Sequence, residues 1–137
     1  MRLPIWHSAL MPNDRDGRSQ LHNAAMRGDL EEVQRLLEVG SEVDGQDRRG
    51  FTPLHFAAQA SHVAEKLLAA GASTNVRDAY GNTALWTATF NSRGHGDLIN
   101  MLLAHGADPD SLNNSGASPR SLAETIGNYD VARFFKG

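Results

Sequence analysis

Apolar residues recur along the chain in short stripes with helical spacing. In the first such stripe, Leu30, Val33, Leu36 and Leu37 would lie on one face of a helix, because they are three or four positions apart. Comparable stripes follow at Val63, Leu67 and Leu68, at Leu98, Met101 and Leu102, and at Val131, Phe134 and Phe135. The apolar runs stop after a few residues, far short of the roughly 18 needed to cross a membrane. The pattern predicts short amphipathic helices that pack against one another.

Two series of glycines give these stripes a common period. The first series recurs after 33, 31 and 35 residues and the second after 31 and 35, at Gly17, Gly50, Gly81 and Gly116 and at Gly40, Gly71 and Gly106. Self-similarity at an interval of this length is the signature of a stacked repeat protein, in which each unit contacts only its neighbours. Two independent series with the same intervals therefore indicate structural repeats.

Each period opens with the residues of a tight turn, followed by a helix start. Asp or Asn three positions before the Gly suits a β-turn, because the side-chain oxygen closes the turn and Gly supplies a positive φ. A good N-cap residue follows the turn, at Ser19, Thr52, Thr83 and Ser118. Pro53 and Pro119 then occupy the first helical position, where the missing N–H costs nothing. A short helix is therefore predicted after each turn.

A second helix is predicted to follow in each period. In the first period, Gly28 ends the short helix and Gly40 suits a left-handed C-cap for the next one. Asp29 can cap that second helix, with Glu32 placed for a capping box. One turn and two antiparallel helices then make the unit. Because a single unit cannot bury its apolar stripe alone, stacking of successive units is expected to stabilise the fold.

Two segments resemble the signature of a known family. Residues 52–58 read TPLHFAA and residues 67–72 read LLAAGA, and both are similar to the ankyrin repeat family. The resemblance implies an all-α fold, an ankyrin-repeat solenoid of helix–turn–helix units with β-turn tips. We divide the ankyrin repeat domain, residues 14–137, into repeats at 14–46, 47–77, 78–112 and 113–137. Residues 1–13 are expected to form an N-terminal capping segment through Leu3, Ile5, Trp6 and Leu10, or alternatively a flexible recognition tail.

Repeat three departs from the period. It is two residues longer than the first repeat, with Ser92 and Arg93 inserted between its two helices. The loop from Asn91 to Gly96 contains two glycines and no apolar residue. We therefore expect this loop to be the most mobile segment, with irregular stacking beside it.

Composition and charge limit the class of protein. The 137 residues include 13 Lys and Arg and 16 Asp and Glu, and the net charge of −3 argues against a strongly basic nucleic-acid-binding surface. Without cysteine, the chain can form no disulfide, thiolate zinc site or cysteine nucleophile. Pro4 and His7 interrupt the N-terminal apolar region, so a secretory signal is not expected. Cytoplasmic residence is the default prediction.

The six histidines do not form the pattern of a catalytic or metal site. His22 and His55 follow the N-cap residue by three positions, where each ring is expected to hydrogen-bond the turns of its own and the neighbouring repeat. The sequence has no His-x-x-x-His pair and no nucleophile motif, and the glycine pair at Gly94 and Gly96 lacks the third glycine of a phosphate-binding loop. We expect no metal, no cofactor and no enzymatic activity.

The family resemblance implies that the chain binds another protein. Ankyrin domains commonly present their turn tips and inner helices as one concave surface, and positions that differ between repeats are free to give specificity. Here these positions include arginine and aromatic residues, which are frequent anchors of interfaces. The predicted protein-binding residues are Arg15, Arg18, Met26, Arg27, Arg48, Arg49, Phe51, Gln59, Tyr80, Asn82, Trp86, Phe90 and Asn91.

These residues also have structural interpretations that the sequence leaves open. Trp86 stands at the position of the framework histidines, where its indole could simply fill the space between repeats. The arginines could form a solvated charged edge beside Asp14, Asp16 and Asp47.

The charged residues suggest the kind of partner. Eleven of the 13 basic residues are Arg, which suits bidentate pairing with carboxylates. Acidic residues on and after the first outer helix, Glu31, Glu32, Glu38 and Glu42, predict an Arg-bearing groove and an acidic back. We therefore predict a non-catalytic, monomeric module that captures a protein with an acidic surface.

Two other functions remain open. Small free-standing ankyrin chains resemble some bacterial immunity proteins, which neutralise a cognate toxin by blocking its active site. Nucleic-acid binding is supported by arginine and aromatic residues on one face, and it is opposed by the net charge of −3.

Overall fold

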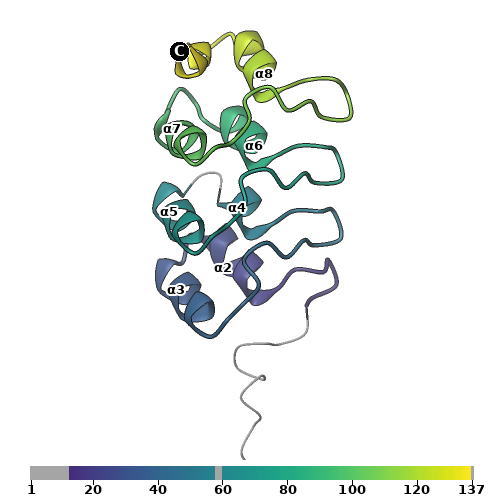
Figure 1. Ribbon diagram of the computed structural model, residues 1–137, viewed down its shortest axis with the longest axis vertical. Coiled ribbons are helices and arrows are strands. Elements are labelled where there is room, and N and C mark those ends of the chain that lie inside the picture. Colours follow the sequence, from purple (N-terminus) through teal and green to yellow (C-terminus); the bar gives the residue numbers. More distant parts are fainter. Residues whose placement is uncertain (1–12, 58–59, 137) are drawn as a thin grey trace, which may run out of the picture.

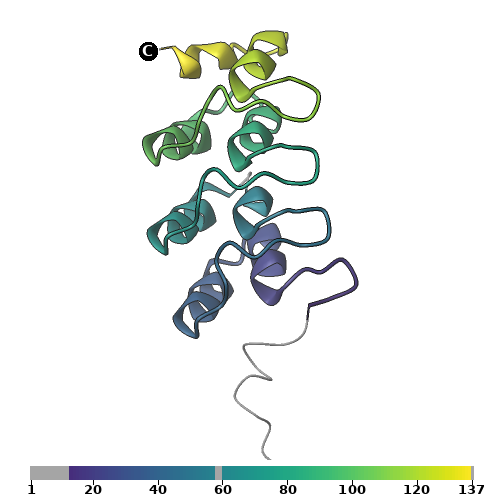
Figure 2. The same cartoon turned by 45° about the vertical axis from the view of Figure 1, so that its right-hand side comes forward.

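The computed structural model describes residues 13–57 and 60–136 of the 137-residue chain. This part of the chain is all helical, with seven α-helices, one short 3-10 helix and no strand. The inner column contains α2 (Gln20–Arg27), α4 (Pro53–Phe56), α6 (Ala84–Phe90) and α8 (Pro119–Thr125). The outer column contains α3 (Leu30–Glu38), α5 (Ser61–Ala69), α7 (Asp97–Ala104) and the 3-10 helix η1 (Val131–Phe135). The turns project beyond the inner column (Figure 1, Figure 2), which confirms the predicted all-α solenoid.

The four turns are closed by the same side-chain contact. In the second turn, the carboxylate atom Oδ1 of Asp47 accepts the backbone N–H groups of Arg49 and Phe51, each at 2.9 Å. Gly50 has a φ of +79°, in the left-handed region that favours glycine, and its N–H donates to the carbonyl of Asp47. Equivalent side-chain contacts close the other turns, at Asp14, Asp78 and Asn113. The predicted turn chemistry is confirmed.

Backbone hydrogen bonds join each turn to the next. The N–H of Arg48 donates to the carbonyl of Asp16, the N–H of Ala79 to that of Arg49, and the N–H of Asn114 to that of Tyr80. The nitrogen–oxygen distances are 2.8 to 2.9 Å. This close approach requires glycine, because a Cβ on Gly50 would lie 2.9 Å from the backbone nitrogen of Ala79. Since both partners are backbone atoms, the spacing of the turns does not depend on the side chains that they present.

The helices begin and end close to the predicted positions. The N-caps of the inner helices are Ser19, Thr52, Thr83 and Ser118. Helix α2 ends at Gly28, which is left-handed with a φ of +70°. Asp29 caps α3 by accepting the N–H of Glu32. The other half of the expected capping box does not form, because the Glu32 carboxylate binds the guanidinium of Arg35 instead.

The core is a continuous seam between the two columns. Six of its leucines are at most 2% exposed: Leu21, Leu54 and Leu85 of the inner column and Leu36, Leu67 and Leu102 of the outer column. Buried alanines, Ala24, Ala57 and Ala88, let the inner helices approach one another closely. Each helix pair therefore shares its core with its neighbours. None of the helices in the described ranges is long and apolar enough to cross a membrane.

The last helix pair departs from the others. Its second helix, η1, is a five-residue 3-10 helix where the sequence predicts an amphipathic helix. In α8, Arg120 stands at the position that Leu54 occupies in α4. The Arg120 guanidinium pairs with Asp110 at 2.8 Å and donates to the carbonyl of Phe135. Polar contacts thus hold α8 at a point where apolar packing holds α4.

The loop between α6 and α7, which the sequence predicts to be the most mobile segment, packs against residues near the C-terminus. A Cβ on Gly94 would lie 2.9 Å from atom Cδ1 of Tyr129, and a Cβ on Gly96 would collide with the ring of Phe134. Gly96 is buried. The longer loop of repeat three therefore reaches the segment that leads into η1 (Figure 1).

Some predictions fall outside the described residues. They concern the N-terminal capping segment, of which residues 1–12 are not described, and the predicted binding residue Gln59.

Candidate protein-binding face

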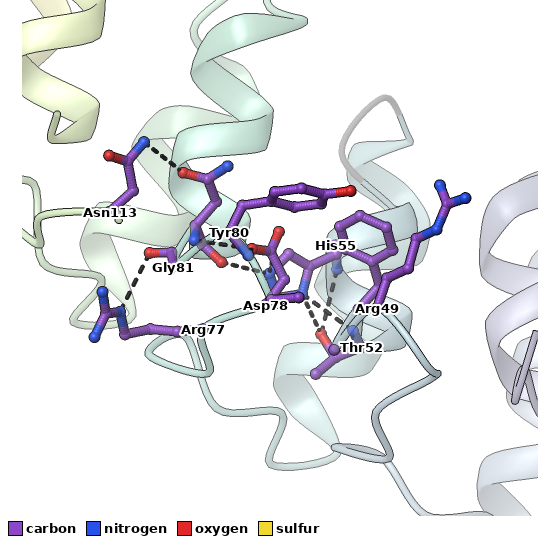
Figure 3. Close-up of polar contacts among 12 residues, drawn as sticks. Arg49, Thr52, His55, Arg77, Asp78, Tyr80, Gly81 and Asn113 are labelled. Carbon is purple, nitrogen blue, oxygen red and sulfur yellow. Dashed lines mark hydrogen bonds and ion pairs between the residues drawn. The ribbon is translucent and has the colours of Figure 1, made fainter. Parts of the chain in front are cut away.

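Several predicted binding residues lie together where the turns project from the inner helices. Arg15, Arg48, Arg49 and Tyr80 are exposed on the first three turns, and half-buried Phe51 leads into α4. Figure 3 shows the side chains of Arg49 and Tyr80 extending from neighbouring turns. We call the surface formed by these five residues the tip face. Its turns are held at fixed spacing by the backbone bonds described above.

Three arginines of the tip face have no charged partner. Within residues 13–57 and 60–136, Arg15, Arg48 and Arg49 take part in no ion pair. A guanidinium presents planar donors that match a carboxylate in a bidentate way. The tip face therefore carries three positive charges that the described residues do not neutralise by direct pairing.

Arg18 is different, because the fold already uses its charge. Its guanidinium lies 3.6 Å from a carboxylate oxygen of Asp16 and 3.8 Å from one of Asp47. It also lies over the ring of Phe56, 5.3 Å from the ring centre. Arg18 therefore joins the first turn to the second, and this supports the charged-edge interpretation for this arginine.

Three aromatic rings, two of them in the tip face, form a row. The ring centre of Phe51 lies 5.5 Å from that of Phe56 and 6.5 Å from that of Tyr80. Phe51 and Phe56 are half-buried, and Tyr80 is 54% exposed. Such contacts hold the rings in fixed orientations. The exposed edge of this row gives the tip face apolar area beside its positive charges.

Other predicted residues lie at the opposite ends of the inner helices. Met26 and Arg27 are exposed at the end of α2, and Phe90 is 63% exposed at the end of α6, next to half-buried Asn91. The ring of Phe90 stacks on that of Trp86 with centres 5.5 Å apart and planes 9° apart. The structure thus separates the predicted residues into two surfaces.

Two further predicted residues have structural contacts. Half-buried Asn82 accepts a hydrogen bond from the side chain of Asn113 at 2.9 Å (Figure 3). The exposed guanidinium of Arg27 lies 3.9 Å from the carboxylate of Asp29. Both contacts leave part of the residue accessible to a partner.

His55 is a buried structural residue, as the sequence predicts. The backbone N–H of Thr52 donates to Nδ1 of His55 at 3.1 Å, so Nδ1 has no proton and Nε2 carries it. Nε2 then donates to the carbonyl of Asn82 in the next repeat at 2.9 Å (Figure 3). Burial lowers the pKa of His55, although the Asn82 carbonyl and the carboxylate of Asp78 act in the opposite direction. The neutral ring therefore links two repeats.

His22 makes the same contacts one repeat earlier. Its Nδ1 accepts the N–H of Ser19 at 3.0 Å, and its Nε2 donates to the carbonyl of Phe51 at 2.8 Å. The sequence prediction for both histidines is confirmed.

Trp86 replaces the histidine in the third repeat, and two polar atoms lose their partners there. The indole Nε1 of Trp86 and the hydroxyl of Thr83 are both buried and have no hydrogen-bond partner among the described residues. In the second repeat, the equivalent hydroxyl of Thr52 lies 2.8 Å from Nδ1 of His55. Trp86 is half-buried.

A second series of links was missed in the sequence. The amide of Gln46, the last residue of repeat one, donates to the carbonyls of Gly50 and Arg77 at 3.0 and 3.2 Å. Arg77, the last residue of repeat two, donates in the same way to the carbonyl of Gly81 at 3.2 Å (Figure 3). It also donates to the carbonyl of Leu112 at 2.8 Å. The available signal was a long polar side chain at the same position of two consecutive repeats.

The outer side near α3 is acidic. Glu31, Glu38 and Glu42 are exposed there, and Glu32 is half-buried. The guanidinium of Arg35 lowers the pKa of Glu32 by hydrogen bonding to its carboxylate. These residues lie on the outer column and beyond it, away from the turns that carry the tip face (Figure 1).

Metal ligands do not cluster in the part of the chain that the structure describes. No group of three or more His, Asp and Glu side chains there could hold a metal ion. His62, His95 and His105 are exposed on separate segments.

Comparison with known proteins identifies the family. A family model described as ankyrin repeats (3 copies) matches residues 6–78 and 21–113. Cyclin-dependent kinase 4 inhibitor B of Bos taurus is 34% identical over 123 residues, which cover 88% of this chain and 92% of that protein.

Longer relatives share only part of their length with the chain. The 2-5A-dependent ribonuclease of Mus musculus is 35% identical over 106 residues, and neurogenic locus notch homolog protein 1 of Danio rerio is 35% identical over 133 residues. These matches cover 77% and 93% of this chain but only 10% and 5% of the two relatives. With the family model, the full-length relative and the stacked turn and helix units in agreement, the chain belongs to the ankyrin repeat family.

Proposed function

We propose that the chain is a non-catalytic module that captures one protein partner on its tip face. The observation that carries this proposal is the set of unpaired arginines, Arg15, Arg48 and Arg49, beside the exposed ring of Tyr80 on rigidly spaced turns. A preorganised surface loses little conformational entropy when it binds. Arg and Tyr are also among the residues that most often dominate binding energy.

The partner surface that suits the tip face is acidic. Three guanidinium groups without carboxylate partners would attract and pair with carboxylates on the other protein. The acidic residues near α3 lie on the other column, so they would not compete closely with the partner. Charge complementarity of this kind speeds association and fixes the orientation of the partner.

The names of the relatives support a narrower form of this proposal. Several relatives whose length the chain mostly covers are named inhibitors of cyclin-dependent kinases, from Rattus norvegicus, Bos taurus and Homo sapiens. A chain of this size can thus act by binding an enzyme. Blocking of a toxin by an immunity protein is one case of such inhibition, and co-expression with the product of the neighbouring gene tests it. Without a complex or relief of toxicity, the immunity hypothesis is wrong.

A capture experiment with two matched variants tests the main proposal. The tip variant replaces Arg15, Arg48 and Arg49 with Gln and Tyr80 with Ala, all four of them exposed residues of the tip face. The control carries four exposed substitutions on the outer column, Glu31→Gln, Glu38→Gln, Glu65→Gln and Lys66→Gln. Each tagged protein is incubated with lysate of the native host, and retained proteins are quantified by mass spectrometry.

The proposal expects a protein that the wild type and the control retain and that the tip variant loses at least tenfold. The circular dichroism spectra of the three chains should agree, because the replaced residues are mostly exposed. Equal retention by the tip variant would contradict the proposed face. Sedimentation of the purified chain tests the accompanying proposal that it is a monomer, and cell fractionation tests cytoplasmic residence.

A further inference from the structure

A pocket of about 330 Å³ lies at the C-terminal ends of α6 and α8. Its apolar walls are the side chains of Phe90, Leu122, Ile126 and Tyr129, and Arg93 contributes to its lining. We call it the α6–α8 pocket. Helix α6 has seven residues and is about 10 Å long, and the tip face lies at its other end. The pocket is therefore a separate surface from the tip face.

The loop of repeat three builds one wall of the pocket. Arg93 has a φ of +51°, which is uncommon for a residue other than glycine and costs conformational energy. The next residue, Gly94, lies so close to Tyr129 that a Cβ would stand 2.9 Å from its ring. This contact holds the backbone beside Arg93 in place. The two-residue insertion thus positions an arginine at the pocket.

The polar groups of the pocket indicate the chemistry that it could bind. Arg93 is the one charged residue that lines it, and Arg93 forms no ion pair within the described ranges. The hydroxyl of Ser92, also in the lining, is buried without a hydrogen-bond partner among those residues. Glu124 and Asp130 are near in sequence but do not line the pocket. A positive charge and apolar walls therefore face the same space.

We propose that the α6–α8 pocket receives an aromatic or large aliphatic side chain of the partner protein, next to a carboxylate that pairs with Arg93. The partner would thus present an apolar residue beside an acidic one. Phe90 and Tyr129 are 63% and 46% exposed, so they can bury apolar area when the pocket is filled. This inference rests on the proposed function and adds a second anchor, at the other end of α6 from the tip face.

A titration of the full chain with short peptides tests this inference. The probe is the blocked hexapeptide acetyl-Gly-Ser-Phe-Asp-Gly-Ser-amide, added to isotope-labelled protein while amide signals are followed by NMR. Two control peptides replace Phe with Ala or Asp with Asn. We expect saturable shifts at Phe90, Arg93 and Ile126, and at least tenfold weaker binding of both control peptides.

Protein variants assign the effect to the pocket. Arg93→Gln should bind the Asp and Asn peptides with equal, weak affinity, and Phe90→Ala should weaken all binding at least tenfold. Lys66→Gln removes a positive charge from an exposed position of α5, and this variant should bind the peptides like the wild type. Because Phe90 and Arg93 are exposed, both variants should keep the dispersed amide spectrum of the wild type.

The results separate this inference from the proposed function. Absent or non-saturable shifts at the pocket, or equal binding of the Phe and Ala peptides, would overturn the inference. So would an undiminished preference of Arg93→Gln for the Asp peptide. Capture of a partner that depends on the tip face would still stand in these cases. If instead the peptide binds as expected but the tip variant retains every partner, the proposed face fails and the pocket becomes the binding site.

Discussion

The junction between repeats two and three and the junction between repeats three and four use the same backbone contacts but different side chains. At the first junction, His55 donates to Asn82 at 2.9 Å, and Arg77 bridges the carbonyls of Gly81 and Leu112. At the second junction, Trp86 stands in place of the histidine and Leu112 in place of Arg77. Two side-chain links of the first junction are therefore missing from the second.

The second junction has partial substitutes for these links. The backbone bond from Asn114 to Tyr80 is present at 2.9 Å, and the side chain of Asn114 donates to the carbonyl of Ala79 at 2.9 Å. The side chain of Asn113 reaches Asn82 at the same distance. These contacts join the turns, but they do not reach the buried space around Trp86. Its Nε1 thus remains without a partner.

The comparison teaches that a hydrogen-bonding histidine position has been exchanged for a stacked aromatic pair, Trp86 and Phe90, of which Phe90 is exposed. Trp86 gives up the hydrogen bonds that His55 makes, and it stacks on Phe90, which lines the α6–α8 pocket. Buried polar atoms without partners cost stability. Proteins commonly tolerate such a cost at sites of function. The junction that lacks these two side-chain links therefore lies beside the proposed second anchor.

The largest predicted effect tests whether the apolar core is equally strong near both junctions. Leu54→Ala in α4 and Leu102→Ala in α7 should each lower the free energy of unfolding by about 2–5 kcal/mol, because both side chains are at most 2% exposed and would leave cavities. Urea unfolding followed by circular dichroism measures the change. The exposed substitution Glu65→Gln serves as the control, with an expected change within about 0.5 kcal/mol.

Unequal losses of unfolding free energy in Leu54→Ala and Leu102→Ala would show that the two junctions also differ in their apolar cores. A loss for Leu102→Ala below about 1 kcal/mol would mean that the seam near repeats three and four is already loose. The difference between the junctions would then not be confined to hydrogen bonds.

The next effect concerns the histidine link at the first junction. His55→Ala should lower the free energy of unfolding by about 1–3 kcal/mol, since the N–H of Thr52 and the carbonyl of Asn82 both lose a buried partner. Trp86→Ala should lose less stability from broken hydrogen bonds, because Nε1 of Trp86 has no hydrogen-bond partner among the described residues. Urea unfolding of both variants at pH 7.5 makes the comparison.

The same residue predicts a pH dependence. Burial lowers the pKa of His55 in the folded chain, so the unfolded chain binds the proton more readily below the ordinary value of about 6.5. The stability that neutral His55 contributes to the folded chain is therefore fully present above about pH 6.5, and it is lost as the pH falls below that value. Urea titrations of the wild type and His55→Ala between pH 7.5 and 5 should show a shallower decline for the variant. Parallel curves would mean that His55 does not cause the decline.

Much of the fold could be predicted from the sequence because it depends on local contacts. Asp47 and Gly50 close a turn within five residues, and the N-cap Thr52 acts over three, so a single repeat contains the necessary signals. The repetition then predicts the stack. For the binding face, the sequence predicts only a set of candidate residues. It does not show which of their charges are already paired within the fold, as the charge of Arg18 is with Asp47.

The features that escaped prediction depend on contacts between distant residues. The packing of Gly94 against Tyr129 joins a loop to residues 35 positions later, and no local pattern indicates it. The α6–α8 pocket follows from this contact, so it was not predictable either. Arg77 likewise acts through the carbonyl of Leu112 in the next repeat. Sequence reasoning located the turns and helices but missed these links between them.

The smallest predicted effect tests the cause of the difference between the junctions. Trp86→His should raise the free energy of unfolding by about 1 kcal/mol. The new ring could accept from the N–H of Thr83 and donate to the carbonyl of Ala117, as His55 does one repeat earlier, with each bond worth about 0.5–1.5 kcal/mol. Against this gain stands the lost stacking on Phe90, worth about 0.5–1.5 kcal/mol. Urea unfolding measures the net change.

A double-mutant cycle assigns the gain to the restored hydrogen bonds. Thr83→Val should have little effect in the wild type, because the hydroxyl has no partner there. In the Trp86→His background the same change should cancel a large part of the gain, because Val cannot bind the new ring nitrogen. Additive effects, or a net loss on Trp86→His, would show that packing of the indole already makes the second junction as strong as the first. The exchange of stability for aromatic surface would then be refuted at the residue on which it depends.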